Sequence, residues 1–463
     1  MAILSITKKL PAALRAGWNR LLGDRRGGIT SYLALATVPL MLSAGVAVDV
    51  SRAYHARARL SHALDAAGLA VGASLDSGAT PQAVFDRFMN ANYPNAAAAL
   101  KGQSVVEVDG SVVRVSARIE METSFMKLAG FDHLTIAAAT EIVREESAME
   151  VVLVLDNTGS MRGQKLETLR LAARELVDIL FGDALVHDQL RVGVVPYAAA
   201  VNVGADAPNL VTQVGQGFFD PSNNTKWKGC VLARPYPNDV LDSPMNAGNK
   251  WKVYRYDSGV DNRWPPVVIR SFYPWRVRGP NVACPTPIAP LTGTKSKITA
   301  AIDAMEIWWG GTFSNLGMVW GWRVLSPERP FTQGRAYAED DNTKAAILMT
   351  DGVNQFGKRI FYSPYRSDYT AYKYLDDRVL GTASYSGATA VLDSRLAEVC
   401  ANMKAKGIVI YTITFALNNA TTQNLYRQCA SDSSKYFNSP SNEDLRTAFR
   451  AIGNDLRQLH ISK

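Results

Sequence analysis

Residues 151–161 read Val-Val-Leu-Val-Leu-Asp-Asn-Thr-Gly-Ser-Met and decide the fold of the chain. Five consecutive apolar residues that run into a glycine-containing turn are typical of a strand buried on both faces of a sheet. Asp156, Thr158 and Ser160 then place one carboxylate and two hydroxyls at the carboxyl end of that strand, where doubly wound sheets form their sites. Such oxygen atoms are the ligands that Mg²⁺ and Ca²⁺ prefer. The alternative interpretation of these residues is an ordinary capped turn that leads into a helix.

The chain after this stretch alternates helix-like and strand-like patterns. A second apolar run, residues 345–350, ends on Asp351-Gly352, and Gly310-Gly311-Thr312 presents another hydroxyl before a helix-like segment. Apolar residues at helical spacing mark residues 166–180, 315–324, 392–406 and 445–459, and strand-like runs mark residues 190–195 and 409–415. This alternation predicts an α/β fold with a doubly wound, mostly parallel sheet that is covered by helices on both faces.

These segments resemble the von Willebrand factor A-type family, whose metal-ion-dependent adhesion site reads Asp-x-Ser-x-Ser, followed by a distant Thr and a distant Asp. The matching positions are Asp156, Thr158, Ser160, Thr312 and Asp351, with Thr158 in place of the first Ser. The resemblance implies a divalent cation held by these side chains, with Mg²⁺ expected first and Ca²⁺ or Mn²⁺ as alternatives. It also implies an open coordination position for an acidic residue of a protein partner. A vestigial cation site in the same fold is the alternative interpretation.

An uncharged stretch at residues 27–48 is long enough to cross a bilayer as a helix, which takes about 20 residues. Cations outnumber the single acid Asp24 before this stretch, so the positive-inside rule places the N-terminus in the cytoplasm and the bulk of the chain outside it. These cations are Lys8, Lys9, Arg15, Arg20, Arg25 and Arg26. The long apolar run, with no clear small-x-small site after it, favours an uncleaved signal anchor over a cleaved signal peptide.

Residues 49–148 predict a small α+β domain after the span. Residues 51–75 continue the same helix, and the alternating residues 105–108 and 113–121 flank Asp109-Gly110, which is a strong hairpin signal. Residues 134–138 add a third strand. The predicted organisation is a cytoplasmic stub (1–26), the span (27–48), the small domain (49–148) and a large domain (149–463) with insertions at about 204–294 and 355–390.

Further motifs resemble the TadE/TadG-like family of the tight-adherence (Flp) pilus machinery. They include Trp227-Lys228-Gly229-Cys230, Cys284-Pro285, Pro290-Leu291-Thr292, residues 320–327 and Met349-Thr350-Asp351-Gly352. The resemblance implies a TadG-type pilus-assembly protein in the bacterial inner membrane, with other pilus-assembly or envelope proteins as partners. A surface adhesin that contacts host or substrate directly and a purely structural envelope scaffold are the alternatives. Pilin-like processing signals usually carry Glu at the fifth residue after a Gly, but Leu33 stands there after Gly28.

All four cysteines lie in the part of the chain predicted to be extracytoplasmic. None belongs to a Cys-x-x-Cys pair or lies at zinc-ligand spacing from a histidine, so an oxidising compartment favours disulfides over a metal site. Proximity in sequence favours the pairs Cys230–Cys284 and Cys400–Cys429, although four cysteines allow three pairings. Buried free thiols are the alternative.

Neither the net charge nor the histidines indicate a nucleic-acid site or an enzyme. Much of the net charge of +8 lies in the cytoplasmic stub, and the other cations are scattered without a recognition motif. The histidines lie in no zinc motif and beside no likely nucleophile. They are His55, His62, His133, His187 and His460. We therefore expect a binding protein that is not an enzyme, with a metal-dependent hydrolase as the catalytic alternative.

The predicted insertion at residues 204–294 is rich in aromatic residues. They include Trp227, Trp251, Tyr254, Tyr256, Trp264, Tyr273 and Trp275. One interpretation is a binding surface for a protein partner or a glycan beside the metal. The favoured interpretation is a small core of the insertion's own, clamped by Cys230–Cys284, because buried aromatic residues are commoner than exposed ones.

Overall fold

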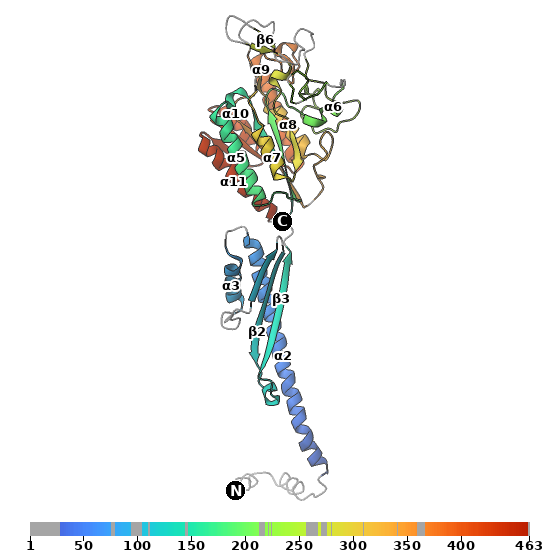
Figure 1. Cartoon of the computed structure of the whole chain (residues 1–463), viewed down its shortest axis with the longest axis vertical. Coiled ribbons are helices and arrows are strands. Elements are labelled where there is room, and N and C mark those ends of the chain that lie inside the picture. Colours follow the sequence, from blue (N-terminus) through green and yellow to red (C-terminus); the bar gives the residue numbers. More distant parts are fainter. Residues whose placement is uncertain are drawn as a thin grey trace, which may run out of the picture. The chain divides into compact units, whose positions relative to one another are not determined.

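The computed structural model describes residues 28–75, 79–93, 104–109, 112–143, 147–212, 218–220, 222–223, 225–255, 267–269, 276–278, 280–308, 310–339, 341–358 and 366–461 (Figure 1). Contacts divide the chain into two compact units, Met1–Glu145 and Glu146–Lys463. The predicted cytoplasmic stub lies outside the described residues. The same holds for several aromatic residues of the predicted insertions, namely Tyr256, Trp264, Tyr273, Trp275, Tyr362 and Tyr365.

The first unit combines a long helix with a three-stranded antiparallel sheet. Its elements are α2 (Gly28–Ser74), α3 (Pro81–Asn92), β1 (Ser104–Asp109), β2 (Val112–Glu122) and β3 (His133–Val143), with the strand order β1-β2-β3. The apolar stripe of α2 that includes Leu60 and Leu64 packs with Phe85 of α3 and Val115 of β2 in one core. The predicted continuation of the helix, the hairpin and the third strand are confirmed, whereas the sequence pattern did not predict α3.

The second unit is built on a six-stranded sheet with the order β13-β12-β10-β4-β5-β8. The strands are β4 (Ala148–Asp156), β5 (Leu190–Tyr197), β8 (Ala289–Thr292), β10 (Asn342–Thr350), β12 (Val409–Phe415) and β13 (Tyr436–Ser439). All pairs are parallel except β5 with the edge strand β8. Every residue of β4 is buried, as expected for an apolar strand in the middle of such a sheet.

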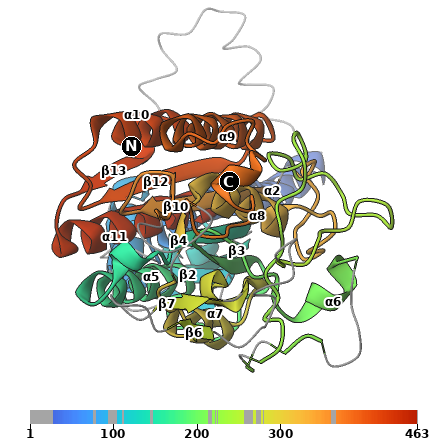
Figure 2. The same ribbon diagram turned by 90° about the horizontal axis from the view of Figure 1, so that it is seen from above.

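Helices cover both faces of this sheet (Figure 2). One face packs against α5 (Gln164–Phe181), α7 (Lys295–Asp303) and α11 (Asn442–Ile461). The other face packs against α8 (Ser314–Leu325), α9 (Tyr385–Ala405) and α10 (Ala420–Cys429). Successive residues of β4 point to opposite faces, since Leu153 belongs to the first core and Val154 to the second. The predicted doubly wound α/β fold is confirmed.

The two predicted insertions are shorter than their sequence patterns indicate. Residues 289–292, at the end of the first, form β8 and complete the main sheet, and α9 already begins at Tyr385, inside the second. The prediction of a separate aromatic core is also wrong for Trp227 and Trp251. Both are buried in the main core, where the Trp251 ring lies 5.0 Å from that of Trp320 on α8. The edge strand β8 was not recognised in the sequence because it lies in a short polar segment with many prolines.

Both predicted disulfides are present. The Cα atoms of Cys230 and Cys284 are 5.6 Å apart, and those of Cys400 and Cys429 are 5.2 Å apart. The first joins a buried cluster that includes Tyr254 and Tyr369, and the second ties α9 to α10. Each closes a loop, which restricts the unfolded chain and stabilises the fold.

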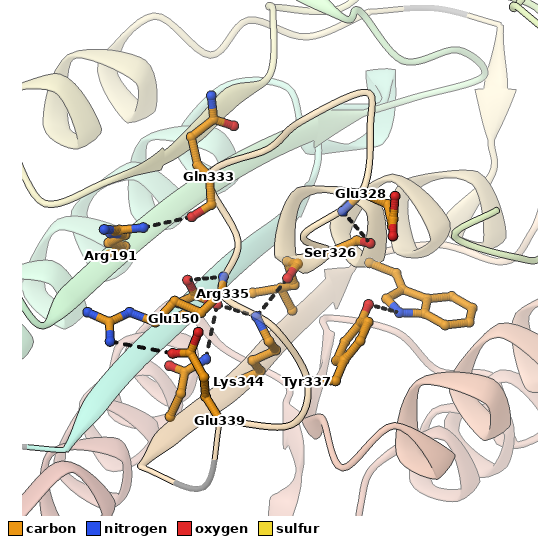
Figure 3. Close-up of polar contacts among 12 residues, drawn as sticks. Glu150, Arg191, Ser326, Glu328, Gln333, Arg335, Tyr337, Glu339 and Lys344 are labelled. Atoms are coloured by element: carbon orange, nitrogen blue, oxygen red, sulfur yellow. Dashed lines mark hydrogen bonds and ion pairs between the residues drawn. The ribbon is translucent and has the colours of Figure 1, made fainter. Parts of the chain in front are cut away.

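The amino ends of β4 and β10 meet in a buried polar cluster (Figure 3). Lys344 of β10 forms an ion pair with Glu150 of β4 and donates a hydrogen bond to the carbonyl of Leu325 over 2.9 Å. Glu150 also accepts hydrogen bonds from the backbone N–H of Arg335 over 2.8 Å and from the Asn342 side chain over 3.3 Å. The cluster fixes the connection between α8 and β10 at this edge of the sheet.

Candidate metal centre

The opposite edge of the sheet gathers the sequence-predicted site residues. Asp156 is the last residue of β4 and Thr350 the last of β10, and these strands are parallel neighbours with Leu155 opposite Met349. The chain turns at this edge after each of the two strands, so Asp351 lies beside Asp156. Their carboxyl groups are buried, with exposed fractions of 0% and 6% for the two residues. The sheet register thus explains why acidic residues almost 200 positions apart meet.

Asp156 is held by the loop that follows β4 and by the neighbouring strand β10. Its Oδ1 accepts a hydrogen bond from the backbone N–H of Thr158 over 2.8 Å. Its Oδ2 accepts one from the Thr350 hydroxyl over 2.7 Å. These bonds fix the orientation of the carboxylate at the end of the strand, and each oxygen keeps a lone pair for a further partner.

The hydroxyls of Thr158 and Ser160, in the loop that follows β4 (the first loop), form a hydrogen-bonded series that ends on the carboxylate of Asp351. The oxygens of Thr158 and Ser160 are 2.9 Å apart, and the Ser160 hydroxyl donates to Oδ1 of Asp351 over 2.5 Å. Ser160 is exposed, whereas Thr158 has only 4% of its surface exposed. The oxygens of the first loop therefore extend from the buried Asp156 to the solvent.

Thr312 lies at the same site but belongs to a different segment of the chain. It lies in β9 (Gly311–Thr312), which pairs with β11 (Gln355–Phe356). Only glycine fits at position 311, where φ is 117° and a Cβ would lie 2.2 Å from the Gln355 carbonyl. The hydroxyls of Thr312 and Ser160 both lie within 4.0 Å of the point where a Cβ on Gly352 would stand. The structure therefore brings all five predicted residues together.

The site holds more negative than positive charge. Among the described residues, Asp156 forms no ion pair, whereas Asp351 Oδ2 accepts a hydrogen bond from the Lys165 ammonium over 2.6 Å. Burial, and next the negative charge of Asp351, raise the pKa of Asp156 to about 6. An ionised Asp156 is thus a buried charge without a cationic partner, which is costly unless a cation neutralises it.

The donor set fits a hard divalent cation. No group of three or more His, Cys, Asp or Glu side chains suited to a metal occurs in the part of the chain that the structure describes, so the candidate site depends on hydroxyl oxygens beside its two carboxylates. Two carboxylates and three hydroxyls supply oxygen alone, which suits Mg²⁺ and leaves positions for water. Ser160, which carries one of these hydroxyls, is an exposed residue.

Two residues of this site, Thr350 and Lys165, were not predicted from the sequence. Thr350 stands directly before Asp351 at the strand end, and this adjacency was a usable signal once the strand was recognised. Lys165 lies on the first turn of α5, and its contact with Asp351 depends on the direction of that helix after the preceding loop. No spacing rule connects residues 165 and 351, so this contact required the structure.

Comparison with known families concerns the N-terminal segment. Residues 27–74 match the family model named Tad, which is described as Flp pilus-assembly TadE/G-like. This segment is TadE/G-like. It contains the whole of α2, and among the described residues one helix, Tyr32–Ser74, is long and apolar enough to cross a membrane. The match supports a pilus-associated role for the chain. No curated protein matches the sequence.

Several solved structures resemble the chain at low identity. The von Willebrand factor domain of the type V pili tip protein Mfa5 from Porphyromonas gingivalis is 12% identical, with a TM-score of 0.39, over 69% of this chain and 98% of that one. The pilus adhesin SpaC from Lactobacillus rhamnosus GG is 12% identical, with a TM-score of 0.37, over 77% of this chain but only 34% of SpaC. Proximal thread matrix protein 1 from the mussel byssus, with a zinc-occupied MIDAS motif, is 12% identical, with a TM-score of 0.33, over 67% of this chain and 46% of that one. The second unit is von Willebrand factor A-like, as its own strand order and its antiparallel edge strand indicate.

Proposed function

We propose that this protein is a membrane-anchored, extracytoplasmic component of the tight-adherence (Flp) pilus assembly machinery. In this proposal α2 crosses the bacterial inner membrane with the N-terminus in the cytoplasm, and the bulk of the chain lies in the periplasm. The TadE/G-like match at residues 27–74 and the exposed apolar side chains of α2 support this placement. Its partners are other pilus-assembly or envelope proteins.

The second unit supplies the binding function in this proposal. Asp156, Thr158, Ser160, Thr312 and Asp351 hold a divalent cation, with Mg²⁺ as the preferred ion. When bound, the cation offers an open coordination position to an acidic side chain of the partner. The observation that carries this proposal is the buried Asp156 carboxylate, which has no ion-pair partner among the described residues and lies beside hydroxyls that extend to the exposed Ser160. The role is recognition, and no residue is assigned to catalysis.

The test of this function is a complementation experiment in a host that lacks the gene. The host receives wild-type protein, the double variant Asp156→Ala, Asp351→Ala, or the control double variant Asp183→Ala, Asp188→Ala. The two control residues are exposed and follow α5, away from the site. Equal protein levels are confirmed by blot, and surface-assembled pilin is then quantified.

We expect surface pilin to be lost in the site variant and retained in the control variant. Normal assembly with the site variant would contradict a role of the metal site in assembly. It would favour either a structural scaffold or direct adhesion, and adhesion of whole cells to a surface would separate these two.

The anchor is tested separately with Leu40→Arg. Leu40 lies in the apolar part of α2, with 68% of its surface exposed. An arginine at the centre of a spanning helix costs about 2.5–3.5 kcal/mol on insertion scales, so stable membrane insertion should be impaired. Unchanged recovery of this variant in carbonate-washed membranes would count against the span.

A further inference from the structure

The loop between β2 and β3 exposes a group of large apolar side chains. This tip loop (residues 123–132) contains the single-turn helix η3 (Met126–Ala129). Phe125, Leu128 and Phe131 have 42%, 71% and 58% of their surfaces exposed. Single exposed apolar residues need no explanation, but three in one short loop indicate a surface that is covered by something else.

The tip loop is fastened to α2 at a defined level. Asp49 of α2 is buried, and its carboxylate accepts hydrogen bonds from the backbone N–H groups of Ser124, Phe125 and Met126 over 3.0, 2.7 and 2.8 Å. One turn earlier, Gly45 lies directly against Phe125. A Cβ on Gly45 would stand 2.6 Å from the Phe125 Cβ, so only glycine allows this close approach.

This level coincides with the end of the apolar part of α2. The helix carries exposed apolar side chains from Tyr32 to Val48, and Asp49 is its first charged residue. At about 1.5 Å per residue, Gly45 lies roughly 6 Å before Asp49 along the helix axis. Phe125 therefore reaches back beside the last turn of the apolar segment, and the exposed side chains of the loop lie next to the surface that lipid would cover.

The charges around the loop suit the border of a bilayer. Arg52 lies within 3.5 Å of Asp49 and donates a hydrogen bond to the Ser124 hydroxyl over 2.5 Å. Lys127 is exposed on η3, and cations at this depth can reach anionic lipid headgroups. The exposed acids Glu122 and Asp132 stand at the base of the loop, where the two strands end.

We propose that the tip loop inserts Phe125, Leu128 and Phe131 into the outer border of the bilayer that α2 spans. The inference rests on the proposed membrane anchor and adds a second lipid contact to it. Continuity of the loop with the apolar surface of α2 selects lipid as the occupant. The second contact restrains the three-stranded sheet at the membrane surface, so both α2 and the tip loop hold the first unit at the membrane.

The experiment measures the depth of single nitroxide labels in the full-length protein. All four native cysteines are paired in disulfides, so Leu128→Cys introduces one free thiol for labelling. Val38→Cys labels the span, and Leu185→Cys labels an exposed position of the second unit, where Leu185 has 76% of its surface exposed. The protein is reconstituted into vesicles of phosphatidylethanolamine and phosphatidylglycerol. Power saturation then compares collisions of each label with oxygen, which enters lipid, and with a water-soluble nickel chelate.

We expect the oxygen-to-nickel ratio at position 128 to approach that at position 38 and to exceed that at position 185 several-fold. A ratio at 128 equal to that at 185, with 38 still in lipid, would overturn the inference and leave the anchor intact. Protection of 128 from both reagents would overturn it in favour of a protein contact. A water-exposed label at 38 would overturn the anchor itself, and with it the second contact.

A pair of glycine variants tests how the loop is held. Gly45→Ala places a Cβ where Phe125 lies, whereas the Cβ of Gly72→Ala on the same helix meets no atom closer than 3.9 Å. We expect Gly45→Ala to lower the oxygen-to-nickel ratio at position 128 and Gly72→Ala to leave it unchanged. An equal ratio in both variants would contradict the docking of the loop on Gly45.

Discussion

The two ends of strand β4 carry buried carboxylates in opposite electrostatic situations. At the amino end, Glu150 is paired with the Lys344 ammonium and accepts hydrogen bonds from Arg335 and Asn342 (Figure 3). At the carboxyl end, Asp156 accepts one hydrogen bond from a backbone N–H and one from a hydroxyl, and it lies beside a second carboxylate, that of Asp351. Both side chains are fully buried. The pair at the amino end is thus balanced in charge, whereas the carboxyl end has two carboxylates and one ammonium, that of Lys165.

This difference separates stability from function within one strand. A buried, hydrogen-bonded ion pair contributes to the fold only as long as both partners remain. A buried carboxylate without a cation costs stability, and proteins keep such groups where a ligand or metal supplies the missing charge.

Glu150→Ala should be the most destabilising change. It leaves the Lys344 ammonium buried without its partner, and loss of one partner of a buried pair costs about 3–5 kcal/mol. Urea unfolding followed by tryptophan fluorescence measures the free energy of unfolding. Mg²⁺ binding by the folded protein should be unchanged. A loss below about 1 kcal/mol would show that the pair is not the structural element described here.

Asp156→Ala should abolish cation binding while the domain stays folded. The substitution removes the carboxylate of the first loop and leaves only neutral oxygens there. Isothermal titration calorimetry with Mg²⁺ should show a loss of affinity of at least about a hundredfold, equivalent to roughly 2.7 kcal/mol. Glu150→Gln, which changes a carboxylate at the other end of the same strand, is the matched control. Unchanged affinity of Asp156→Ala would remove this residue from the ligand set.

The metal-free protein should lose stability as the pH rises through about 6, because the pKa of Asp156 is raised to about 6 in the fold. Burial favours the neutral form, so the folded state binds this proton more tightly than the unfolded state does. The free energy of unfolding should therefore be higher near pH 4 and fall by about 2–3 kcal/mol above pH 6 from this group. Asp156→Asn should remove this slope and be no less stable than the wild type at pH 7.5 without metal. Thermal unfolding in chelator across this range is the measurement, and a destabilised Asn variant would contradict the account.

Lys165→Met should tighten cation binding. The Lys165 ammonium occupies Oδ2 of Asp351 and so competes with a metal for that oxygen. The side chain is one third exposed, so solvent weakens the pair, and we expect an affinity gain of about threefold to tenfold. Lys435→Met, which removes an ion pair with Asp455 elsewhere, is the control. Weaker binding in Lys165→Met would mean that the lysine supports the site.

Thr158→Ser should have the smallest effect. The substitution keeps the hydroxyl next to Ser160 and restores the family's usual residue, losing one methyl group. The dissociation constant for Mg²⁺ should change by less than about threefold, equivalent to roughly 0.6 kcal/mol. A larger change would undermine the assignment of Thr158 to the ligand set, and Thr168→Ser on the neighbouring helix is the control.

The sequence predicted most of this architecture because local patterns decided it. The continuous apolar run of β4 is typical of a central strand, and its closing Asp156 marked the edge where the site forms. β8 escaped prediction because this edge strand holds only four residues, one of them a proline, beside a polar segment. The burial of Trp251 in the main core and the contact of Lys165 with Asp351 join distant positions, and periodicity carries no information about such pairs.

Anomalous diffraction from crystals soaked in Mn²⁺, which prefers the same oxygen ligands as Mg²⁺, would locate the cation directly. We expect an anomalous peak at the carboxyl end of β4, roughly 2–2.6 Å from ligand oxygens that include the Ser160 hydroxyl. The peak should be absent from crystals of Asp156→Ala. Wild-type crystals with ordered side chains, with Lys165 still on Asp351 and no peak at this edge, would show that these residues do not form a cation site.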